Sequence, residues 1–276
     1  MKADKSHNYS ASPKPSHLSR RDAEQFQDES VVEAYPLRPA YPAEVFDILL
    51  GLLDRECRYV LDVGCGTGEI ARRLAPLVER IDAVDFSPAM IRKGKHLPGG
   101  DLHNLRWICS AVEDAALSPP YGLVTAAASL HWMDWDVVLP RFRETLSPND
   151  CLAIIEDKVQ PTPCPEALWP LVRRCSTNQE YQPYDLIVEL EKRGLFLKKG
   201  EHLTDHTLFQ QPVEDYVESF HARNGFSRDH MSRENAEAFD GQAREMLLRA
   251  FPDGIAQLTV EARVVWGMPA RPANHK

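Results

Sequence analysis

The sequence lacks the features that mark membrane, secreted and metal-binding proteins. No apolar run reaches the roughly 18 residues that a membrane-spanning helix needs, and no signal-peptide core is present. The six cysteines form no C-x-x-C pair and no regular framework, which disfavours a zinc site and disulfide bonds. The net charge of -9 disfavours nucleic acid as a partner. We therefore expect a soluble, cytoplasmic protein with no metal, no nucleic acid partner and no membrane contact.

The most informative segment that is present is a glycine-rich turn between a predicted strand and a predicted helix. Residues 60–70 read VLDVGCGTGEI, an apolar run followed by three alternating glycines. Glycine lets another group approach the backbone closely, and the first turn of a helix offers unpaired N–H groups to an anion. Together these elements form the nucleotide-binding corner of a doubly wound sheet. The residues of this turn that we assign to a cofactor site are Asp62, Gly64, Cys65, Gly66 and Gly68.

A second predicted strand ends in a carboxylate at the distance expected for a ribose ligand. Residues 81–85 read IDAVD, and Asp85 follows the glycine turn by about 20 residues. Phe86 and Met90 come next and are placed to flank an adenine ring. Glu69 occupies the position where the G-x-G-x-x-G turn of dinucleotide-binding proteins has its last glycine. A nicotinamide-dependent oxidoreductase is therefore the less favoured alternative.

Three segments carry a family resemblance. The G-x-G-x-G turn resembles motif I of the class I S-adenosylmethionine (SAM) methyltransferases, and residues 85–90 (DFSPAM) resemble their second motif. Residues 35–42 (YPLRPAYP) are similar to a segment that precedes motif I in the type 11 methyltransferases that resemble trans-aconitate methyltransferase. This resemblance implies that SAM is the cofactor, with S-adenosylhomocysteine (SAH) as product. It also implies that Tyr35 and Arg38 lie over the cofactor and that Tyr41 lies near the substrate.

The resemblance assigns roles to two later loops as well. In the family, the loop after the fourth strand passes beneath the methionine part of SAM. Here that loop reads Ser-Leu-His-Trp, which places Ser129 at the cofactor and Trp132 at the substrate. The family usually has an aspartate that contacts adenine at the position of Ala111. We expect the backbone of Ala111 and Val112, or the carboxylate of Glu113, to replace that contact.

The order of predicted elements indicates an α/β fold. We expect a Rossmann-like, seven-stranded, mostly parallel sheet with helices on both faces, an antiparallel last strand and a helical cap insertion. The expected divisions are a disordered tail (1–19), N-terminal helices with the SAM-binding core (20–155), a substrate-binding cap (156–200), the rest of the sheet with further cap helices (201–267) and a C-terminal tail (268–276).

Two strands and one helix of the expected fold have specific predicted positions. The fifth strand is expected at residues 151–155, and a strand at residues 203–209 is expected to resume the sheet. A helix over residues 20–34 has only a weak apolar stripe, which indicates that it packs against the active-site mouth or another subunit. An oligomer formed through this helix is therefore a further prediction.

The chemistry implied by the resemblance needs few catalytic groups. Methyl transfer from a sulfonium is an in-line displacement, so orientation of the reacting atoms supplies much of the rate. If the nucleophile must lose a proton, His131 is the candidate base, because it follows the fourth strand and histidine titrates near neutral pH. The alternative is a histidine that only positions the loop.

The expected function is methyl transfer to O, N or C of a small metabolite. Aromatic residues in the predicted cap favour a hydrophobic or aromatic acceptor, with Tyr41, His131 and Trp132 at the substrate. Arginines such as Arg173 and Arg223 leave a carboxylate substrate open. The alternative from a different class is a non-catalytic SAM-fold protein that binds a ligand or serves as a partner subunit.

Overall fold

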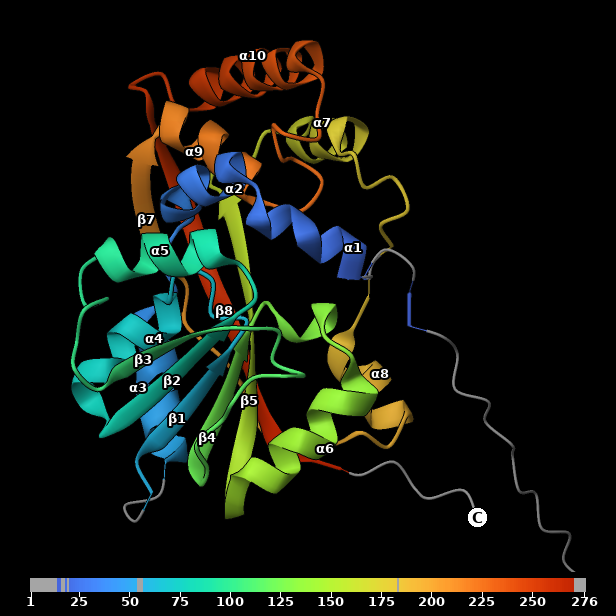
Figure 1. The fold of residues 1–276 in the computed structure, drawn as a ribbon. Coiled ribbons are helices and arrows are strands. Elements are labelled where there is room, and N and C mark those ends of the chain that lie inside the picture. Colours follow the sequence, from blue (N-terminus) through green and yellow to red (C-terminus); the bar gives the residue numbers. More distant parts are fainter. Residues whose placement is uncertain (1–13, 16–17, 19, 54–56, 183, 271–276) are drawn as a thin grey trace, which may run out of the picture.

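The computed structural model describes residues 14–15, 18, 20–53, 57–182 and 184–270, as Figure 1 shows. Most of the two predicted tails lies outside these described residues. The strands are β1 (Tyr59–Val63), β2 (Arg80–Asp85), β3 (Leu105–Cys109), β4 (Tyr121–Ala127), β5 (Leu146–Pro161), β6 (Phe196–Leu203), β7 (Thr207–Pro212) and β8 (Ile255–Pro269). The α-helices are α1 (Arg20–Ala23), α2 (Glu29–Ala34), α3 (Ala43–Leu52), α4 (Glu69–Leu74), α5 (Pro88–His96), α6 (Trp135–Thr145), α7 (Leu168–Cys175), α8 (Leu186–Lys192), α9 (Val213–Ser219) and α10 (Arg233–Ala250).

The strands form one sheet in the order β3-β2-β1-β4-β5-β8-β6, with β7 also paired to β8. Strands β1 to β5 are parallel to one another, and β8 runs antiparallel to β5, β6 and β7. Strands β1, β2 and β4 are buried along almost their whole length, as expected for parallel strands that are covered on both faces. The predicted α/β, Rossmann-like fold with an antiparallel last strand is thereby confirmed.

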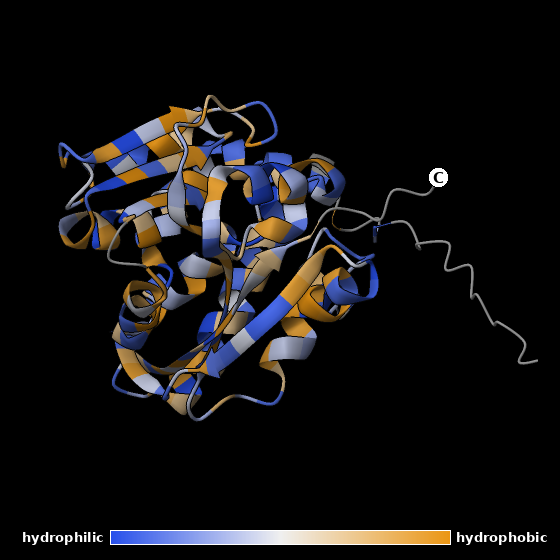
Figure 2. Ribbon diagram, turned by 90° about the horizontal axis from the view of Figure 1, so that it is seen from below, coloured by the Kyte–Doolittle hydropathy of each residue, from blue (hydrophilic) through white to orange (hydrophobic). Residues whose placement is uncertain are grey.

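Helices cover both faces of the sheet. Helices α3 and α4 contribute to one buried apolar cluster, and α6 and α8 contribute to the cluster on the opposite face. Figure 1 shows these helices on either side of the twisted strands, and Figure 2 shows hydrophobic and hydrophilic residues interspersed along strands and helices. Because each face of the sheet is packed, the carboxyl ends of β1, β2 and β4 are left as the edge where a ligand can approach the backbone.

The prediction of seven strands is wrong, because the sheet has eight. The single strand expected at residues 203–209 is two strands, β6 and β7, separated by a break at residues 204–206. At this break Thr204 donates its backbone N–H to the Ala262 carbonyl (2.9 Å), and its Oγ1 accepts from the Ala262 N–H (3.0 Å). A side-chain oxygen thus replaces a backbone partner there and interrupts the strand. Strand β6 also begins at Phe196, inside the segment predicted to be cap.

Strand β5 is longer than predicted and supports a second layer of helices. It continues past Ile155 to Pro161, paired with β8 along the way. The far ends of β5 and β8, together with β7, carry helices α7, α9 and α10, which we call the helical lobe (residues 162–175 and 207–258). This lobe has its own apolar cluster, which includes Tyr216, Phe220 and Phe239. The helices predicted to form a substrate cap therefore belong to an extension of the sheet, built from two separate stretches of sequence.

The N-terminal segment crosses between the helical lobe and the sheet, as Figure 1 shows. The single helix predicted for residues 20–34 is instead α1, a 3-10 turn η2 (Glu24–Gln27) and α2, interrupted at Asp28, whose backbone is extended. Asn224 donates its side-chain N–H to the Asp22 carbonyl (2.7 Å), and Ser227 donates its hydroxyl to the Asp28 carboxylate (2.6 Å). The segment is therefore docked on the lobe, while an oligomer formed through it stays a prediction.

Candidate functional site

The glycine turn has a backbone that only glycine adopts readily. Gly64, Gly66 and Gly68 have φ values of 61°, 55° and 81°. A Cβ added to Gly64 would lie 2.5 Å from the Cβ of Ser129, and one added to Gly66 would lie 3.3 Å from the Tyr35 hydroxyl oxygen. The turn therefore brings its backbone against the loop after β4 and against the N-terminal segment, with no room for side chains.

Asp85 at the end of β2 holds this turn in place. One oxygen of its carboxylate accepts the backbone N–H of Gly66 and the other accepts that of Ser87, both at 2.8 Å. Ser87 in turn caps α5, because its hydroxyl accepts the backbone N–H of Met90 (3.2 Å). Burial raises the pKa of Asp85 to about 6.

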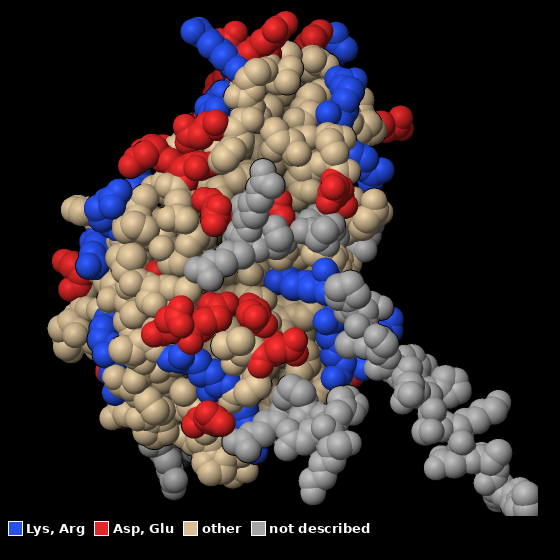
Figure 3. All heavy atoms as spheres, turned by 45° about the vertical axis from the view of Figure 1, so that its right-hand side comes forward, with Lys and Arg blue, Asp and Glu red and all other residues tan. Residues whose placement is uncertain are grey.

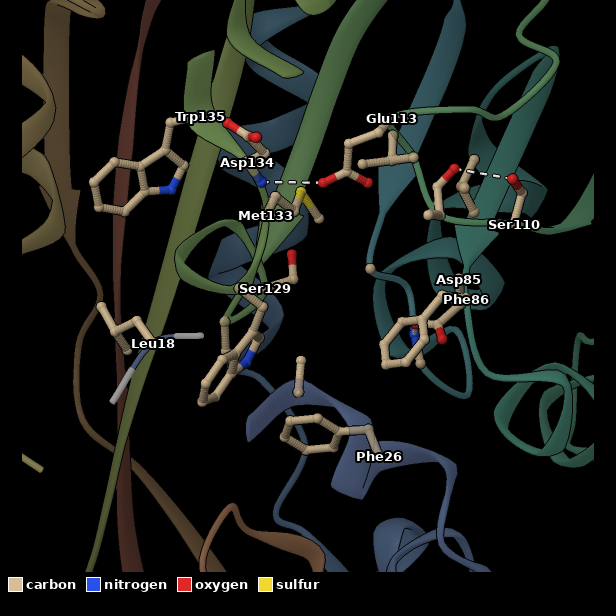
Figure 4. Close-up of a pocket in the computed structure, with 18 of the residues that line it drawn as sticks. Leu18, Phe26, Asp85, Phe86, Ser110, Glu113, Ser129, Met133, Asp134 and Trp135 are labelled. Carbon is tan, nitrogen blue, oxygen red and sulfur yellow. Dashed lines mark hydrogen bonds between the residues drawn. The ribbon is translucent and has the colours of Figure 1, made fainter. Parts of the chain in front are cut away.

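A cavity of about 810 Å³ opens above these elements, at the carboxyl ends of the parallel strands, and Figure 4 shows part of its wall. It is large enough for a nucleoside-sized ligand. Twelve of the residues assigned from the sequence to the cofactor or substrate line it. They are Tyr35, Arg38, Gly64, Gly66, Asp85, Phe86, Met90, Ala111, Val112, Glu113, Ser129 and Trp132.

Three other residues assigned to the cofactor do not line this cavity but lie beneath its wall. The Asp62 carboxylate is buried and accepts the Thr125 hydroxyl (2.9 Å), and burial raises its pKa to about 7. Cys65 is buried in the apolar cluster beneath the turn. Gly68 caps the start of α4, where an added Cβ would lie 2.5 Å from the Trp107 ring. Each of these residues shapes the turn that the cavity wall is made of.

The assigned pair Tyr35 and Arg38 joins the cavity to a carboxylate on β5. Arg38 donates to the Tyr35 hydroxyl (3.4 Å) and forms an ion pair with Asp157 (3.5 Å). Tyr41 lies near this pair. Burial raises the pKa of the Tyr41 hydroxyl, and the negative charge of Asp157 raises it further. Tyr41 is outside the residues that line the cavity. No local pattern indicated a role for Asp157, because its partner lies more than a hundred residues away.

A second cavity, of about 370 Å³, adjoins the first. The two share Leu18, Ala128, Ser129 and Trp132 as wall residues. Ala128 has a φ of 48°, which is strained for any residue with a Cβ. Its backbone N–H donates to the Ile155 carbonyl (2.9 Å), so the bend is fixed by hydrogen bonding to β5. A strained residue therefore lies where the two cavities meet.

The second cavity contains His131, which does not line the first. Its imidazole packs on the Trp132 indole with ring centroids 4.5 Å apart. Glu156 also lines this cavity, and burial raises the pKa of its carboxyl. The wall is otherwise a mixture of apolar strand residues and polar side chains from the segment after α7. These residues include Ile154, Ile155, Asp157, Asn178, Tyr181, Tyr184 and Asn224.

Several wall residues of the first cavity belong to no recognised sequence motif and were therefore not predicted. Phe26 comes from the N-terminal segment, and its weak apolar stripe was the only signal. Trp135 at the start of α6 is flanked by two cations, with Lys14 Nζ 5.1 Å and the Arg193 guanidinium 5.2 Å from its ring centroid. Nothing in the local sequence of Lys14 or Arg193 pairs them with an indole, because the contact depends on packing between distant segments.

No group of three or more His, Cys, Asp or Glu side chains among the described residues could hold a metal ion. Of the helices in the described part of the chain, none is both long enough and apolar enough to cross a membrane.

Comparison with known proteins finds a family that matches part of the chain. Residues 60–149 match the family described as "Methyltransferase domain". The chain is 35% identical over 77 residues to malonyl-(acyl-carrier protein) O-methyltransferase 1 of Ilyobacter polytropus, which covers 27% of this chain and 28% of that protein. It is 31% identical over 138 residues to an uncharacterized methyltransferase of Mycobacterium tuberculosis, which covers 50% of this chain and 54% of that protein. The matches thus span only about a quarter to a half of these relatives.

The fold has a counterpart among solved structures. A provisionally assigned type II methyltransferase of Anaeromyxobacter dehalogenans superimposes with a TM-score of 0.59 at 22% identity, over 84% of this chain and 99% of that one. At this level of identity the likeness concerns the fold alone. Together with the family match, it agrees with the glycine turn and the strand order described above. Residues 60–149 therefore resemble a methyltransferase domain in sequence, and the chain has the fold of a solved methyltransferase structure.

Proposed function

We propose that the chain transfers a methyl group from SAM, held in the first cavity, to a small-molecule acceptor held in the second. The observation that carries this proposal is the meeting of two cavities at Ala128 and Ser129, beside the glycine turn. A methyltransferase needs two ligands whose reacting ends approach each other in line. Two adjoining cavities, one against the glycine turn, supply that arrangement.

Each part of SAM has a counterpart in the first cavity. The Asp85 carboxylate would accept the ribose hydroxyls with the lone pairs that the backbone leaves free. Phe86 and Met90 would hold the adenine ring. Glu113 already accepts the Asp134 backbone N–H (3.0 Å), as Figure 4 shows, so its second carboxylate oxygen would face the adenine amino group. The methionine part would lie along the glycine turn and the β4 loop.

The chemical step is a displacement at carbon. The acceptor's lone pair forms a bond to the methyl carbon as the bond from sulfur to that carbon breaks, and the pair of electrons left on sulfur gives neutral SAH. A proton on an O or N nucleophile would pass to a base in the second cavity. His131 is our candidate for this base. Glu156 is the alternative, because its raised pKa suits it to accept a proton.

The lining of the second cavity supports an acceptor with an apolar or aromatic body. Ile154, Tyr181 and Trp132 offer apolar area, and the asparagine side chains offer directed hydrogen bonds. On the face drawn in Figure 3, basic and acidic side chains are interspersed, which agrees with a small acceptor better than with a nucleic acid. The relative from Ilyobacter is named for a protein-bound malonyl group, but the match is too short to carry that acceptor over.

The proposal is tested in two stages. Calorimetric titration with SAH, with NADH as the control ligand, should give micromolar binding of SAH alone. Labelled SAM with a panel of small aromatic acceptors should then give labelled products. Failure to bind SAH would contradict the proposal, whereas binding without methyl transfer would favour a non-catalytic binding protein.

The role of His131 is tested separately by His131→Gln, with His206→Gln as the matched control outside both cavities. If His131 is the base, its substitution should lower the rate by roughly 100-fold while SAH affinity is unchanged. An acceptor that carries no proton of high pKa should be methylated at nearly the original rate. A loss of SAH affinity instead would indicate that His131 only positions the β4 loop.

A further inference from the structure

A third cavity, of about 410 Å³, lies between β5 and the helical lobe. Its charged wall residues are Arg38, Asp157, Lys158 and Arg223, so basic groups outnumber acidic ones by three to one. It shares Arg38 with the first cavity and Asp157 with the second. The Arg38–Asp157 ion pair therefore connects the third cavity to the walls of the first and second cavities.

Arg223 is the cation of this cavity that lacks a counter-ion. It makes no ion pair with any carboxylate in the part of the chain that the structure describes, and the carboxylate that acts on it, Asp157, is already paired with Arg38. Two other arginines illustrate the matched case: Arg106 lies 2.6 Å from an Asp82 oxygen and Arg228 lies 2.6 Å from a Glu218 oxygen. An unmatched guanidinium in a partly buried place is costly unless a ligand completes it.

The contacts that Arg223 does make hold it in position without neutralising it. Its guanidinium lies 4.4 Å from the Phe220 ring centroid and 5.9 Å from that of Trp169. Such contacts stabilise a cation only modestly. The Tyr216 hydroxyl interacts with the guanidinium electrostatically but has no hydrogen-bond partner of normal geometry among the described residues. Aromatic side chains thus orient the guanidinium without supplying it with a carboxylate partner.

We infer that the third cavity is an anion subsite, in which Arg223 binds a carboxylate or phosphate group of the acceptor. Guanidinium donors match the two oxygens of either group, and the Trp169 ring beside them suits an aromatic or planar body. This inference rests on the proposed function and deepens it, because it assigns the acceptor a negative charge. Lys158 contributes less, since it is already paired with Glu261 at 2.9 Å.

The test is calorimetric titration of the SAH-loaded protein with benzoate, phenyl phosphate and the neutral isostere benzamide. We expect one of the two anions to bind at least about tenfold more tightly than benzamide, and the tighter one identifies the group. Arg223→Gln should weaken binding of that anion about tenfold or more and leave benzamide unchanged. The control is Arg173→Gln, which removes the same charge from the exposed side of α7 and should have no effect.

Arg223→Lys keeps the charge and removes the fork of donors, so it provides a second variant if Arg223→Gln fails to fold. It should recover part of the binding of phenyl phosphate but little of the binding of benzoate. Equal binding of the three ligands, no binding by the original protein, or unchanged anion binding in both variants would overturn the inference.

The same samples separate this inference from the proposed function. If SAH binds and an anionic acceptor is methylated equally well by the protein and by Arg223→Gln, the function stands and the subsite is wrong. If SAH does not bind but benzoate still binds through Arg223, the anion site stands and the methyl-transfer proposal is wrong.

Discussion

The sheet and the helical lobe both bury charged side chains, but they assemble them differently. In the sheet, Asp82 on β2 accepts two N–H groups of Arg106 on β3, and the two residues are direct neighbours in the register of these strands. In the lobe, His221 is fully buried between the Phe226 carbonyl (2.7 Å) and the Asp240 carboxylate (2.8 Å). The first pair follows from strand pairing, whereas the second joins a turn, a loop and a helix.

The same difference separates the two proposed ligand sites. The cofactor cavity uses backbone and side chains that lie within a few residues of a strand end, such as the glycine turn and Asp85. The acceptor side uses residues from β5, from the loop before α8 and from the loop after η6 (Phe220–Ala222). A site built from neighbouring segments of the chain can be predicted from the sequence. A site built from distant segments can be recognised only in the folded structure. Variants in each region should therefore affect the cofactor cavity and the acceptor side separately.

The largest effect is expected from truncating one phenylalanine in each region. Phe239 in α10 and Phe142 in α6 are both fully buried, and replacing either by Ala should lower the free energy of unfolding by about 3–5 kcal/mol. We expect Phe239→Ala to increase amide hydrogen exchange in the lobe and to leave SAH affinity nearly unchanged. Phe142→Ala should increase exchange across β4 and β5 and weaken SAH binding. Identical exchange patterns in the two variants would mean that sheet and lobe unfold as one unit.

The next effect concerns the cofactor side alone. Asp85→Ala removes the carboxylate that orders the Gly66 N–H and that would accept the ribose hydroxyls, so SAH affinity should fall by about 1.5–3 kcal/mol. Calorimetry measures this directly, with Asp101→Ala at an exposed loop position as the control. Anion binding at Arg223 should be unchanged. An SAH affinity within twofold of the original would remove Asp85 from the ribose site.

The sequence predicted the cofactor half of this chain because its signals are local. Three alternating glycines, the strand after them and Asp85 specify backbone and ligand within about 25 residues, and the turn has the expected positive φ values. The same reasoning failed at two places beside the lobe. The Thr204 side chain breaks a strand by bonding to Ala262, and β5 continues past residue 155 because β8 pairs with it. Both depend on a partner strand that the local sequence does not reveal.

The acceptor side was predicted less well for the same physical reason. His131 was placed correctly after β4, but it lies on the second cavity, because η5 (Leu130–Trp132) turns it away from the first. Arg223 was one of several arginines noted without a reason to prefer it. What distinguishes it is that it lies in the wall of a cavity and makes no ion pair among the described residues, which is a property of the packed structure. Position at a cavity and charge pairing together, more than residue type, therefore identify candidate ligand contacts in this region.

A smaller effect is expected from pH, and it has opposite signs for stability and for binding. The pKa of Asp85 is raised by burial from 3.8 to about 6, so its contribution to stability is present below pH 4 and is lost as the pH rises through 6. Ribose hydroxyls that donate to the carboxylate favour its charged form. SAH affinity should therefore rise up to tenfold per pH unit between about 4 and 6, and level off above. In Asp85→Asn this rise should be absent, and its persistence would point to another group, such as Asp62.

The smallest effect concerns the joint between the N-terminal segment and the lobe. The Asp28 carboxylate accepts the Ser227 hydroxyl (2.6 Å) and lies 3.1 Å from His230, so Asp28→Asn weakens two contacts at a half-buried position. A loss of about 0.5–1 kcal/mol should raise amide exchange of residues 20–34 by about two- to fivefold. Glu29→Gln, at an exposed neighbour, is the matched control. Because Phe26 and Ala23 line the first cavity, the loosened segment should also release SAH slightly faster. Faster exchange without faster release would show that this segment packs on the lobe independently of the cofactor cavity.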